Sequence, residues 1–576
     1  TFTISNEAGE PLPQVMISRI PLEVPEANLA DDGYAPNGVT NRTATTQTRF
    51  SNNQGRVTFT DTDRAFRYRV RAQGYIDAEL LEPGANLILK RMTAEQNIAS
   101  YPSNVWLSKL EFGGDIELKK TFQLNCAFCH QQASSFMRGE RTEEQWISIF
   151  ERMNGYGARL PDDDHQKIAE LLRKEYRQLR ENPQQVPQPR AWESHLAEIE
   201  MTEWPMGDSF SQMHDFLLHP DGNIYIGDNL QDRIYALDPE SGDYTVFKVP
   251  HDTDARLGGF LGNRFTTFPK LNNYMGVHSF AYSKKDGNIF ITPSMQQALL
   301  EFNPRSREFT THKMPEGFYP HTIRIDDKDR VWFTLAVSSQ VAMFDREKQK
   351  FKFYDLPSRG FKEWLTIKAL PFIFWMDPEN QPRPSPDREG NGLPMPYGID
   401  IAPDGMVWVA RLYANDLAII NPETDEITML DFPFGGPRRL RADANGNIWI
   451  VAFQDSLLVK YDPKAAKFTS YDLPVVNEIP YSLNVDKKNA VVWVNGNQSD
   501  TLLSFDIASE SWKVFPLPKQ RFFGRDVEID EETGAVYVTN SHFPTWQSEG
   551  GIPTLLRITP VEQQEESIIE SVPVTQ

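Results

Sequence analysis

From about residue 195 to residue 560 the chain repeats one pattern seven times, and this repetition constrains its fold more than any other feature. Each unit contains a polar turn with Asp or Asn, a short apolar strand, a second polar turn and an aromatic-rich strand that often ends in Pro. The apolar strands are 223–226, 288–291, 331–333, 407–409, 448–450, 492–494 and 536–538. Four short strands in about 43 residues are typical of one blade of a β-propeller. The repeats therefore predict a seven-bladed β-propeller over residues 191–576.

The two ends of the repeat region predict how the ring closes. The seventh unit ends at 558–560 without a fourth strand, whereas residues 195–201, followed by Trp204 and Pro205, precede the first unit and have the composition of one. Pairing this segment with the seventh unit would close the ring and leave no open strand edge. An unclosed array of strands is the alternative.

Two units carry a recognisable signature. Pro-His-Thr-Ile at 320–323 precedes Val-Trp-Phe-Thr at 331–334, and Pro-Tyr-Gly-Ile at 396–399 precedes Pro-Asp-Gly at 403–405. Through these motifs residues 195–560 resemble the streptogramin lyase (virginiamycin B lyase) class of propellers. The resemblance implies the fold, but one fold hosts many chemistries, so it does not by itself select a reaction.

Residues 1–97 have the pattern of a small β-sandwich. Short alternating strands are separated by turn residues. The strands include 2–4, 57–60 and 68–70. Through the stretches 6–12, 51–57 and 74–75 this region resembles the carboxypeptidase regulatory-like domain. The resemblance implies a spacer or interaction module without catalysis.

The motif Cys126-Ala127-Phe128-Cys129-His130 matches the attachment pattern of c-type haem. Two thiols one helical turn apart can reach both vinyl groups of one porphyrin, and the next residue then places its imidazole under the iron. A zinc site would need about four ligands, and the chain holds only two cysteines. A redox dithiol would need a βαβ context, which the neighbouring pattern does not provide. We therefore expect one covalent haem c held by Cys126, Cys129 and His130.

Residues 101–190 change from strand to helix character around this motif. Apolar residues recur with helical spacing at 143–153 and 165–179. With these helices the region resembles a small class I cytochrome c domain. The resemblance implies Met153, which precedes the last helix, as the second ligand of the haem iron, and a thioether ligand raises the redox potential. The alternatives are His165, Met137 and an open coordination position.

The innermost strand of each predicted blade begins with the same local pattern, so its second residue can be compared between blades. In chain order these residues are His214, His278, His321, Tyr397, Arg438, Tyr481 and Arg525. They should ring one mouth of the central channel, and His542, after the second strand of the seventh unit, should lie on the same face. Because the chain has ten histidines, three at one equivalent position favour an active site over a merely hydrated channel. The candidate catalytic residues are His214, His278, His321, Tyr397, Arg438, Arg525 and His542.

Two chemistries fit this ring of residues. His214, His278 and His321 could bind a second metal ion, either copper, iron, zinc or calcium, with an open coordination position. They could instead act as a general base and hydrogen-bond donors, while the arginines hold a carboxylate or another anion.

Two insertions should lie at the same mouth. They cover about 251–276 and 358–394, and each connects an outer strand to the next inner strand. The second is rich in aromatic residues, so it could roof a pocket and exclude water, or it could pack against the haem domain.

Charge and hydropathy limit the partners. The chain has 59 Lys and Arg against 80 Asp and Glu, a formal net charge of −21, which argues against nucleic acid and against an anionic membrane surface. The longest apolar run, 369–376, is too short to span a bilayer, so we expect no transmembrane segment. Covalent haem attachment implies assembly outside the cytoplasm. We therefore expect a periplasmic protein whose signal peptide has been removed.

Together these patterns predict a mainly β protein in three parts: a β-sandwich at 1–97, a small helical cytochrome c domain at 101–190 and a seven-bladed propeller at 191–576. We expect an oxidoreductase that oxidises a small organic substrate at the propeller mouth. Its electrons would pass through the haem to a soluble acceptor such as a cytochrome c or a cupredoxin. The alternatives are a metal-dependent lyase or hydrolase of the streptogramin lyase-like class, and a non-enzymatic electron-transfer or docking protein.

Overall fold

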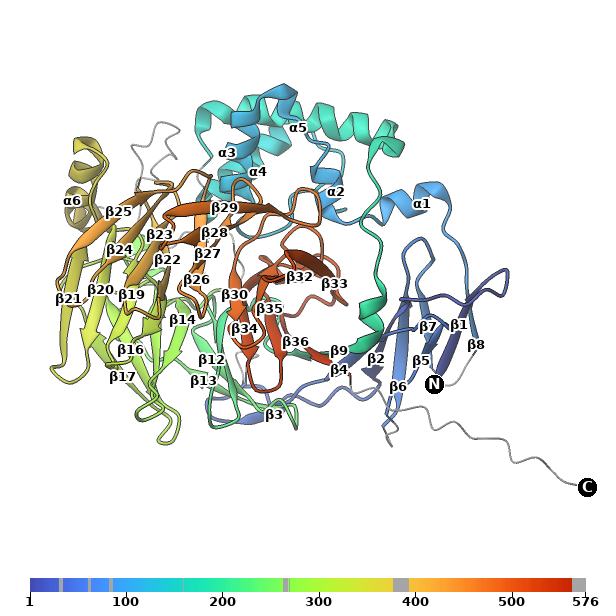
Figure 1. Cartoon of the computed structure of the whole chain (residues 1–576), viewed down its shortest axis with the longest axis horizontal. Helices are drawn as coiled ribbons and strands as arrows, with labels where there is room; N and C mark the ends of the chain where they lie inside the picture. Colours follow the sequence, from blue (N-terminus) through green and yellow to red (C-terminus); the bar gives the residue numbers. More distant parts are fainter. Residues whose placement is uncertain are drawn as a thin grey trace, which may run out of the picture.

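The structure, a computed structural model, describes residues 1–30, 35–60, 64–81, 86–158, 160–262, 268, 270–376 and 393–561. Strands dominate these ranges, and most of the helices lie together above the sheets (Figure 1). The chain is therefore mainly β, as the repeats predict. No helix in these ranges is both long enough and apolar enough to cross a membrane.

Seven groups of four antiparallel strands follow one another in the chain. The first three are β10 (Met213–Leu218), β11 (Ile224–Asp228), β12 (Arg233–Leu237) and β13 (Asp243–Lys248); β14 (Val277–Tyr282), β15 (Ile289–Pro293), β16 (Ala298–Asn303) and β17 (Glu308–Lys313); and β18 (Pro320–Ile325), β19 (Val331–Leu335), β20 (Gln340–Asp345) and β21 (Lys350–Asp355). The next three are β22 (Pro396–Ile401), β23 (Val407–Arg411), β24 (Asp416–Ile420) and β25 (Ile427–Asp431); β26 (Pro437–Ala442), β27 (Ile448–Ala452), β28 (Leu457–Asp462) and β29 (Lys467–Asp472); and β30 (Leu483–Asp486), β31 (Val491–Asn495), β32 (Thr501–Asp506) and β33 (Ser511–Pro516). The seventh joins β34 (Gly524–Asp530), β35 (Ala535–Asn540) and β36 (Thr554–Pro560) to β9 (Ile199–Pro205).

The seven groups are arranged in a propeller-like ring. The innermost strands β10, β14, β18, β22, β26, β30 and β34 contact one another in that order, and β34 also contacts β10. β36 pairs with β9 over its whole length, from Thr554 opposite Pro205 to Pro560 opposite Ile199. The prediction that the segment before the first unit supplies the missing strand of the seventh is therefore confirmed.

The N-terminal strands are hydrogen-bonded to two of these sheets. β4 pairs with the outer edge of β9, and β3 pairs with the outer edge of β13. The expectation that ring closure alone leaves no open edge is wrong. One edge of β9 pairs with β36 when the ring closes, but its other edge would remain unpaired, and β4 pairs with that edge. The N-terminal strands are β1 (Phe2–Asn6), β2 (Met16–Pro21), β3 (Thr40–Arg42), β4 (Thr46–Phe50), β5 (Arg56–Val57), β6 (Phe66–Arg71), β7 (Ala78–Leu80) and β8 (Asn86–Leu89).

The helices form a layer on the face of the ring where the innermost strands begin. The layer consists of α1 (Ala94–Ala99), α2 (Ser103–Leu107), α3 (Ile116–Cys126), α4 (Glu143–Tyr156) and α5 (Asp162–Glu181). α4 and α5 confirm the two helices predicted from apolar spacing. Thr142 caps α4 in a reciprocal pair with Gln145, which satisfies two backbone donors of its first turn. α5 buries one face of regularly spaced residues against the other helices.

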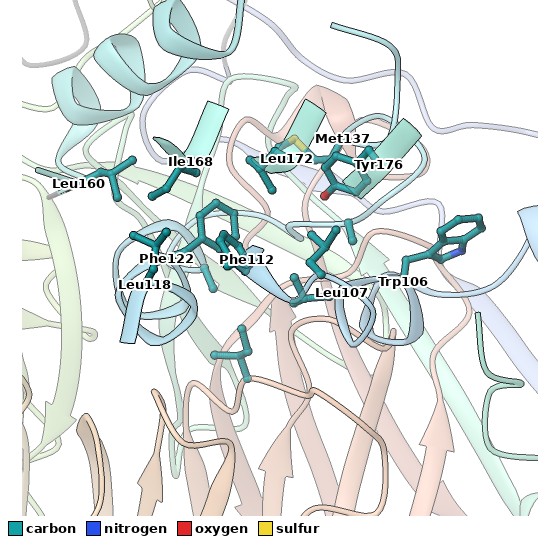
Figure 2. Close-up of a cluster of buried hydrophobic side chains, with 14 of the residues drawn as sticks. Trp106, Leu107, Phe112, Leu118, Phe122, Met137, Leu160, Ile168, Leu172 and Tyr176 are labelled. Carbon is teal, nitrogen blue, oxygen red and sulfur yellow. The ribbon is translucent and has the colours of Figure 1, made fainter. Parts of the chain in front are cut away.

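The helical layer and the propeller mouth share one apolar core. Figure 2 shows Phe122 of α3 pointing toward Ile168 and Leu172 of α5. The same cluster of buried side chains continues into the propeller through Tyr397 and Tyr481. The helices are therefore packed onto the mouth of the ring.

Glu478, just before β30, helps to hold this layer. Its buried Oε1 accepts the backbone N–H of Gln498 at 2.6 Å, and the side-chain oxygen of Gln498 accepts the N–H of Gln132, beyond α3, at 2.8 Å. Burial raises the pKa of Glu478 to about 7 from an ordinary value of 4.5. Because the pKa of Glu478 is higher in the folded than in the unfolded protein, its contribution to the free energy of unfolding is complete below pH 4.5. This contribution is lost as the pH rises through 7.

We therefore expect the free energy of unfolding to fall by up to roughly 3 kcal/mol across this pH range because of Glu478. Glu478→Gln should flatten that part of the curve, whereas Glu423→Gln, which changes an exposed carboxylate, should leave it unchanged. Urea unfolding at a series of pH values measures both. A wild-type slope that persists in Glu478→Gln would contradict the assignment.

Candidate functional site

A recurring β-bulge turns the predicted ring residues toward the channel. In the first blade Met213 pairs with Asp228 but Phe216 pairs with Ile226, so two residues of β10 stand opposite one residue of β11. The same shift occurs at the start of β14, β18, β22, β26 and β34. Bulges re-aim side chains and are common beside active sites. The bulged positions are those that the sequence comparison between blades selects.

In the sixth blade an asparagine side chain holds the backbone at the ring position, where the other blades have a β-bulge. Tyr481 and Ser482 precede β30, and their backbone N–H groups donate to the side-chain oxygen of Asn495 at 3.2 and 2.9 Å. The Asn side chain thus replaces two ladder hydrogen bonds. Tyr481 is the ring member to which the sequence analysis assigns no role.

The first four ring residues form a row of close contacts. The ring centroids of His214 and His278 are 3.8 Å apart, those of His278 and His321 are 3.9 Å apart, and those of His321 and Tyr397 are 3.8 Å apart. All four side chains are buried. The structure therefore brings these predicted residues together.

The imidazoles of this row are uncharged at neutral pH. Burial lowers the pKa of His214 to about 4, although Asp215 opposes the shift, and burial also holds the pKa values of His278 and His321 well below the usual value. The Nδ1 of His214 lies 2.8 Å from Oδ1 of Asp215. Because a neutral imidazole carries one proton, donation to Asp215 leaves the Nε2 lone pair of His214 as a proton acceptor.

A buried ion-pair group crosses the axis at the next residue of three inner strands. Arg439 of β26 donates to both oxygens of Asp215 on β10, at 2.7 and 2.9 Å, and to Asp526 on β34 at 2.8 Å. Burial raises the pKa of Asp526 to about 8, and the charge of Asp215 adds to the rise. Burial also raises the pKa of Asp215, but Arg439, His214 and His278 together outweigh burial, so this pKa lies well below its usual value. One guanidinium thus connects three blades.

The other side of the ring is a cluster of two phenols and two guanidiniums. The hydroxyl oxygens of Tyr397 and Tyr481 are 2.5 Å apart, Arg438 donates to Tyr397 at 2.8 Å, and Arg525 donates to Tyr481 at 2.9 Å. The guanidinium of Arg438 lies 3.5 Å from the ring centroid of Tyr481. Burial raises the pKa of Tyr481, but Arg438, Arg525 and Arg439 outweigh it, so the pKa falls below the usual value.

Gly398, next to Tyr397, allows this cluster to pack. A Cβ at Gly398 would lie 2.6 Å from the carbonyl oxygen of Arg438, which is backbone and cannot swing away. We expect Gly398→Ala to destabilise the fold by about 1–3 kcal/mol, because overpacking forces backbone shifts. A lowered urea midpoint would show this. Gly360→Ala, where a Cβ meets nothing within 4 Å, is the matched control, and equal midpoints for the two variants would contradict the prediction.

The Cys-X-X-Cys-His motif lies against this cluster. Cys126 ends α3, and no disulfide joins it to Cys129. Arg525 donates to the carbonyl oxygen of Phe128 at 2.8 Å, and the carbonyl oxygen of Cys129 accepts the N–H of Phe543 at 2.9 Å. Burial raises the pKa of Cys126 to about 12. The motif is therefore bound directly to the seventh blade.

One cavity of about 760 Å³ connects the motif to the ring. Cys126, Cys129 and His130 line one wall, and His214, His278, Tyr397 and Arg525 line another. The helix α6 (Phe361–Met376) forms a third wall through Thr366, Leu370, Ile373 and Phe374. The predicted roof thus lines the cavity, although 377–392 of that insertion, with 263–267 and 269 of the other, lie outside the described residues.

Three predicted site residues are not among the residues that line this cavity. Arg438 packs between the rings of Phe128, Phe453 and Tyr481, so it contacts Tyr481 without lining the cavity. His321 is covered by the rings of His278 and Tyr397. The Nδ1 of His542 lies 3.1 Å from the carbonyl oxygen of Pro544, and its ring is centred 6.0 Å from that of His130.

The residues around the motif fit a haem. The thiols of Cys126 and Cys129 share a wall with His130, whose Nδ1 lies 3.0 Å from the carbonyl oxygen of Gln131. Donation to that oxygen leaves Nε2 as the metal-binding nitrogen. The same part of the cavity is lined by large apolar side chains, as a porphyrin requires: Phe122, Met137, Trp146, Ile149, Phe150, Met153 and Leu160.

The candidates for a second iron ligand differ in their surroundings. Met153 and Met137 both line the cavity. The Nε2 of His165 instead lies 3.1 Å from the side-chain nitrogen of Asn154, so its lone pair already accepts a hydrogen bond. The geometry favours a methionine over His165.

The candidate second metal site has a different membership from the predicted one. Ligand atoms of His214, Asp215 and His278 lie within 4.8 Å of one another, and among the described residues His321 falls outside this group. Asp215 is also bound by Arg439, so a cation would compete with a guanidinium for the same carboxylate.

Comparison with protein-family models gave no match, and no curated protein matches the sequence significantly. Solved structures that are similar include a streptogramin B lyase (15% identity, TM-score 0.47, covering 63% of this chain and 98% of that one). They also include the virginiamycin B lyase of Staphylococcus aureus (13% identity, TM-score 0.47, covering 63% and 100%) and the β-propeller domain of Cps50 (Swd1) from Myceliophteria thermophila (11% identity, TM-score 0.42, covering 62% and 100%). The structural neighbours are thus streptogramin lyase-like and other β-propellers.

Proposed function

We propose that this protein is an exported c-type haem oxidoreductase that oxidises a small organic substrate in the cavity between the helical layer and the propeller mouth. The single observation that carries the proposal is the shared cavity, which has the Cys-X-X-Cys-His motif on one wall and the histidine row on another. Substrate and haem would then be neighbours without any movement of the chain. The periplasm is the proposed location.

The haem would be held by thioether bonds to Cys126 and Cys129, and His130 and Met153 would bind its iron. When bound, it would supply one-electron chemistry, so the two electrons released by one substrate molecule would leave in two successive transfers to a soluble protein such as a cytochrome c or a cupredoxin. Met153 is the ligand that raises its potential.

The remaining chemistry belongs to the chain. His214, fixed by Asp215, offers Nε2 to accept a proton from the substrate. Arg525 lies beside it, with Nη1 at 3.5 Å from that nitrogen. The apolar side chains of α6 exclude water from this part of the cavity.

The test is substrate-dependent reduction of the haem. Holoprotein matured with covalent haem is oxidised and mixed anaerobically with a panel of alcohols, aldehydes and organic acids, and the visible α band is followed. We expect one class of compound to reduce the haem, and His214→Gln to slow this by roughly 100-fold. His251→Gln, an exposed residue, is the control. Haem that no compound of the panel reduces would reject the proposal.

A metal-dependent lyase or hydrolase is a second candidate, and only the His214, Asp215 and His278 group favours it. Elemental analysis of the purified holoprotein separates the two. One metal ion besides the haem iron, lost in His278→Ala, would support the lyase or hydrolase; iron alone would support the oxidoreductase.

A further inference from the structure

The cavity carries the opposite charge to the rest of the chain. The chain has 80 acidic and 59 basic residues. The described residues that line the cavity nevertheless include Arg141, Arg152 and Arg525 and no Asp or Glu. A concave, largely apolar site with guanidiniums and no carboxylates attracts anions.

Arg525 of β34 is a buried arginine that lines the cavity and has no carboxylate partner among the described residues. Arg439 is bound by Asp215 and Asp526, and Arg411 by Asp416, whereas Arg438 also lacks a described carboxylate partner but is enclosed by aromatic rings and does not line the cavity. Arg525 is 6% exposed, and its described partners are the hydroxyl of Tyr481, the carbonyl oxygen of Phe128 and, at 3.5 Å, Nε2 of His214. Its Nε has no hydrogen-bond partner within the described structure. A buried guanidinium without a carboxylate is costly, and an anionic ligand would offset that cost.

The groups around Arg525 can contact the remaining part of a small ligand whose carboxylate binds Arg525. The Nε2 of His214 is 3.5 Å from Nη1 of Arg525. The Nδ1 of His278, a side chain 2% exposed, lacks a partner among the described residues. Both residues line the cavity, and Leu370, Phe374 and Met395 supply apolar walls. A ligand bound here can therefore present one anionic group to Arg525 and an apolar body to α6.

We infer that the cavity binds a small monocarboxylate with an apolar body, and that Arg525 binds its carboxylate beside His214. The inference rests on the proposed function for the statement that this ligand is the substrate. A haem propionate carries the same chemistry and is the competing occupant of Arg525. Arg141 and Arg152 lie near the haem-binding wall, on the helical layer, and suit the propionates instead.

The experiment uses holoprotein with sodium benzoate as the probe and benzamide as its uncharged match. We expect isothermal titration to detect benzoate binding and to find benzamide at least about tenfold weaker, because a charge-assisted hydrogen bond is worth about 1.5–3 kcal/mol. Arg525→Gln should weaken benzoate binding by a similar factor, Arg525→Lys should restore part of it, and Arg42→Gln, far from the cavity, should change nothing.

The outcomes of this experiment distinguish a bound monocarboxylate ligand from a haem propionate as the partner of Arg525. Equal binding of benzoate and benzamide to wild-type protein overturns the inference even if Arg525→Gln does not fold. Unchanged benzoate binding in Arg525→Gln, together with a shifted haem potential, assigns the guanidinium to a propionate and also overturns it. Benzoate binding that depends on Arg525 in a protein whose haem no compound reduces would uphold the inference and reject the proposed oxidoreductase.

Discussion

Replacing both Cys126 and Cys129 with Ser is expected to abolish covalent haem attachment completely. The structure places Cys126 at the end of α3 and Cys129 just beyond it, and both line the shared cavity with His130. The chain has no other cysteine, so no second residue can form the thioether bonds. Haem staining after denaturing electrophoresis and the intact mass of the protein measure the effect.

The single variant Cys126→Ser is the matched comparison. One thiol remains in it, so a fraction of the protein should keep one thioether bond and one unreacted vinyl group, which shifts the visible spectrum. Haem that survives denaturation in the double variant would contradict the prediction. Colourless wild-type protein from a host that matures other c-type cytochromes would reject the haem site itself.

Arg439→Met is expected to lower the free energy of unfolding by about 3–5 kcal/mol, the largest stability effect at the channel. The guanidinium is essentially inaccessible and is bound by Asp215 and Asp526 from two other blades. Removing it leaves the buried carboxylate of Asp215 without this positive charge, beside Asp526, whose pKa is already raised by burial. Urea unfolding followed by tryptophan fluorescence measures the loss.

Arg42→Met is the control for this variant, because it removes an arginine from an ion pair with Asp243 at 2.6 Å in which both side chains are exposed. Exposed pairs contribute about 0–1 kcal/mol, so this midpoint should barely move. If the two variants unfold at the same urea concentration, the cross-axis pairs do not stabilise the ring.

The sequence predicts the elements of this fold well where a local pattern specifies them. The seven apolar strands lie on β11, β15, β19, β23, β27, β31 and β35. The helices at 143–153 and 165–179 are α4 and α5. Comparison between blades also selects the residues that surround the channel, because the same bulge at the same repeat position gives the same side-chain direction.

The partners of these residues are not visible in the sequence. Arg438 and Arg525 occupy equivalent repeat positions, yet Arg525 lines the cavity and Arg438 is enclosed by aromatic rings. Asp215 joins the histidines as a candidate ligand in place of His321. β4 binds the edge of β9 across more than 150 residues of chain, and no periodicity indicates which edge it takes.

The amino-acid sequence alone determined the number of blades, the strand that completes the seventh and the helices α4 and α5. Each depends on residues that are near one another in the chain or repeat at a constant spacing. Only the tertiary structure decided that the motif and the histidine row share one cavity, and that Arg439 connects three blades. Contacts between distant segments depend on how the helices pack onto the ring, which local propensity and hydrophobic period do not encode.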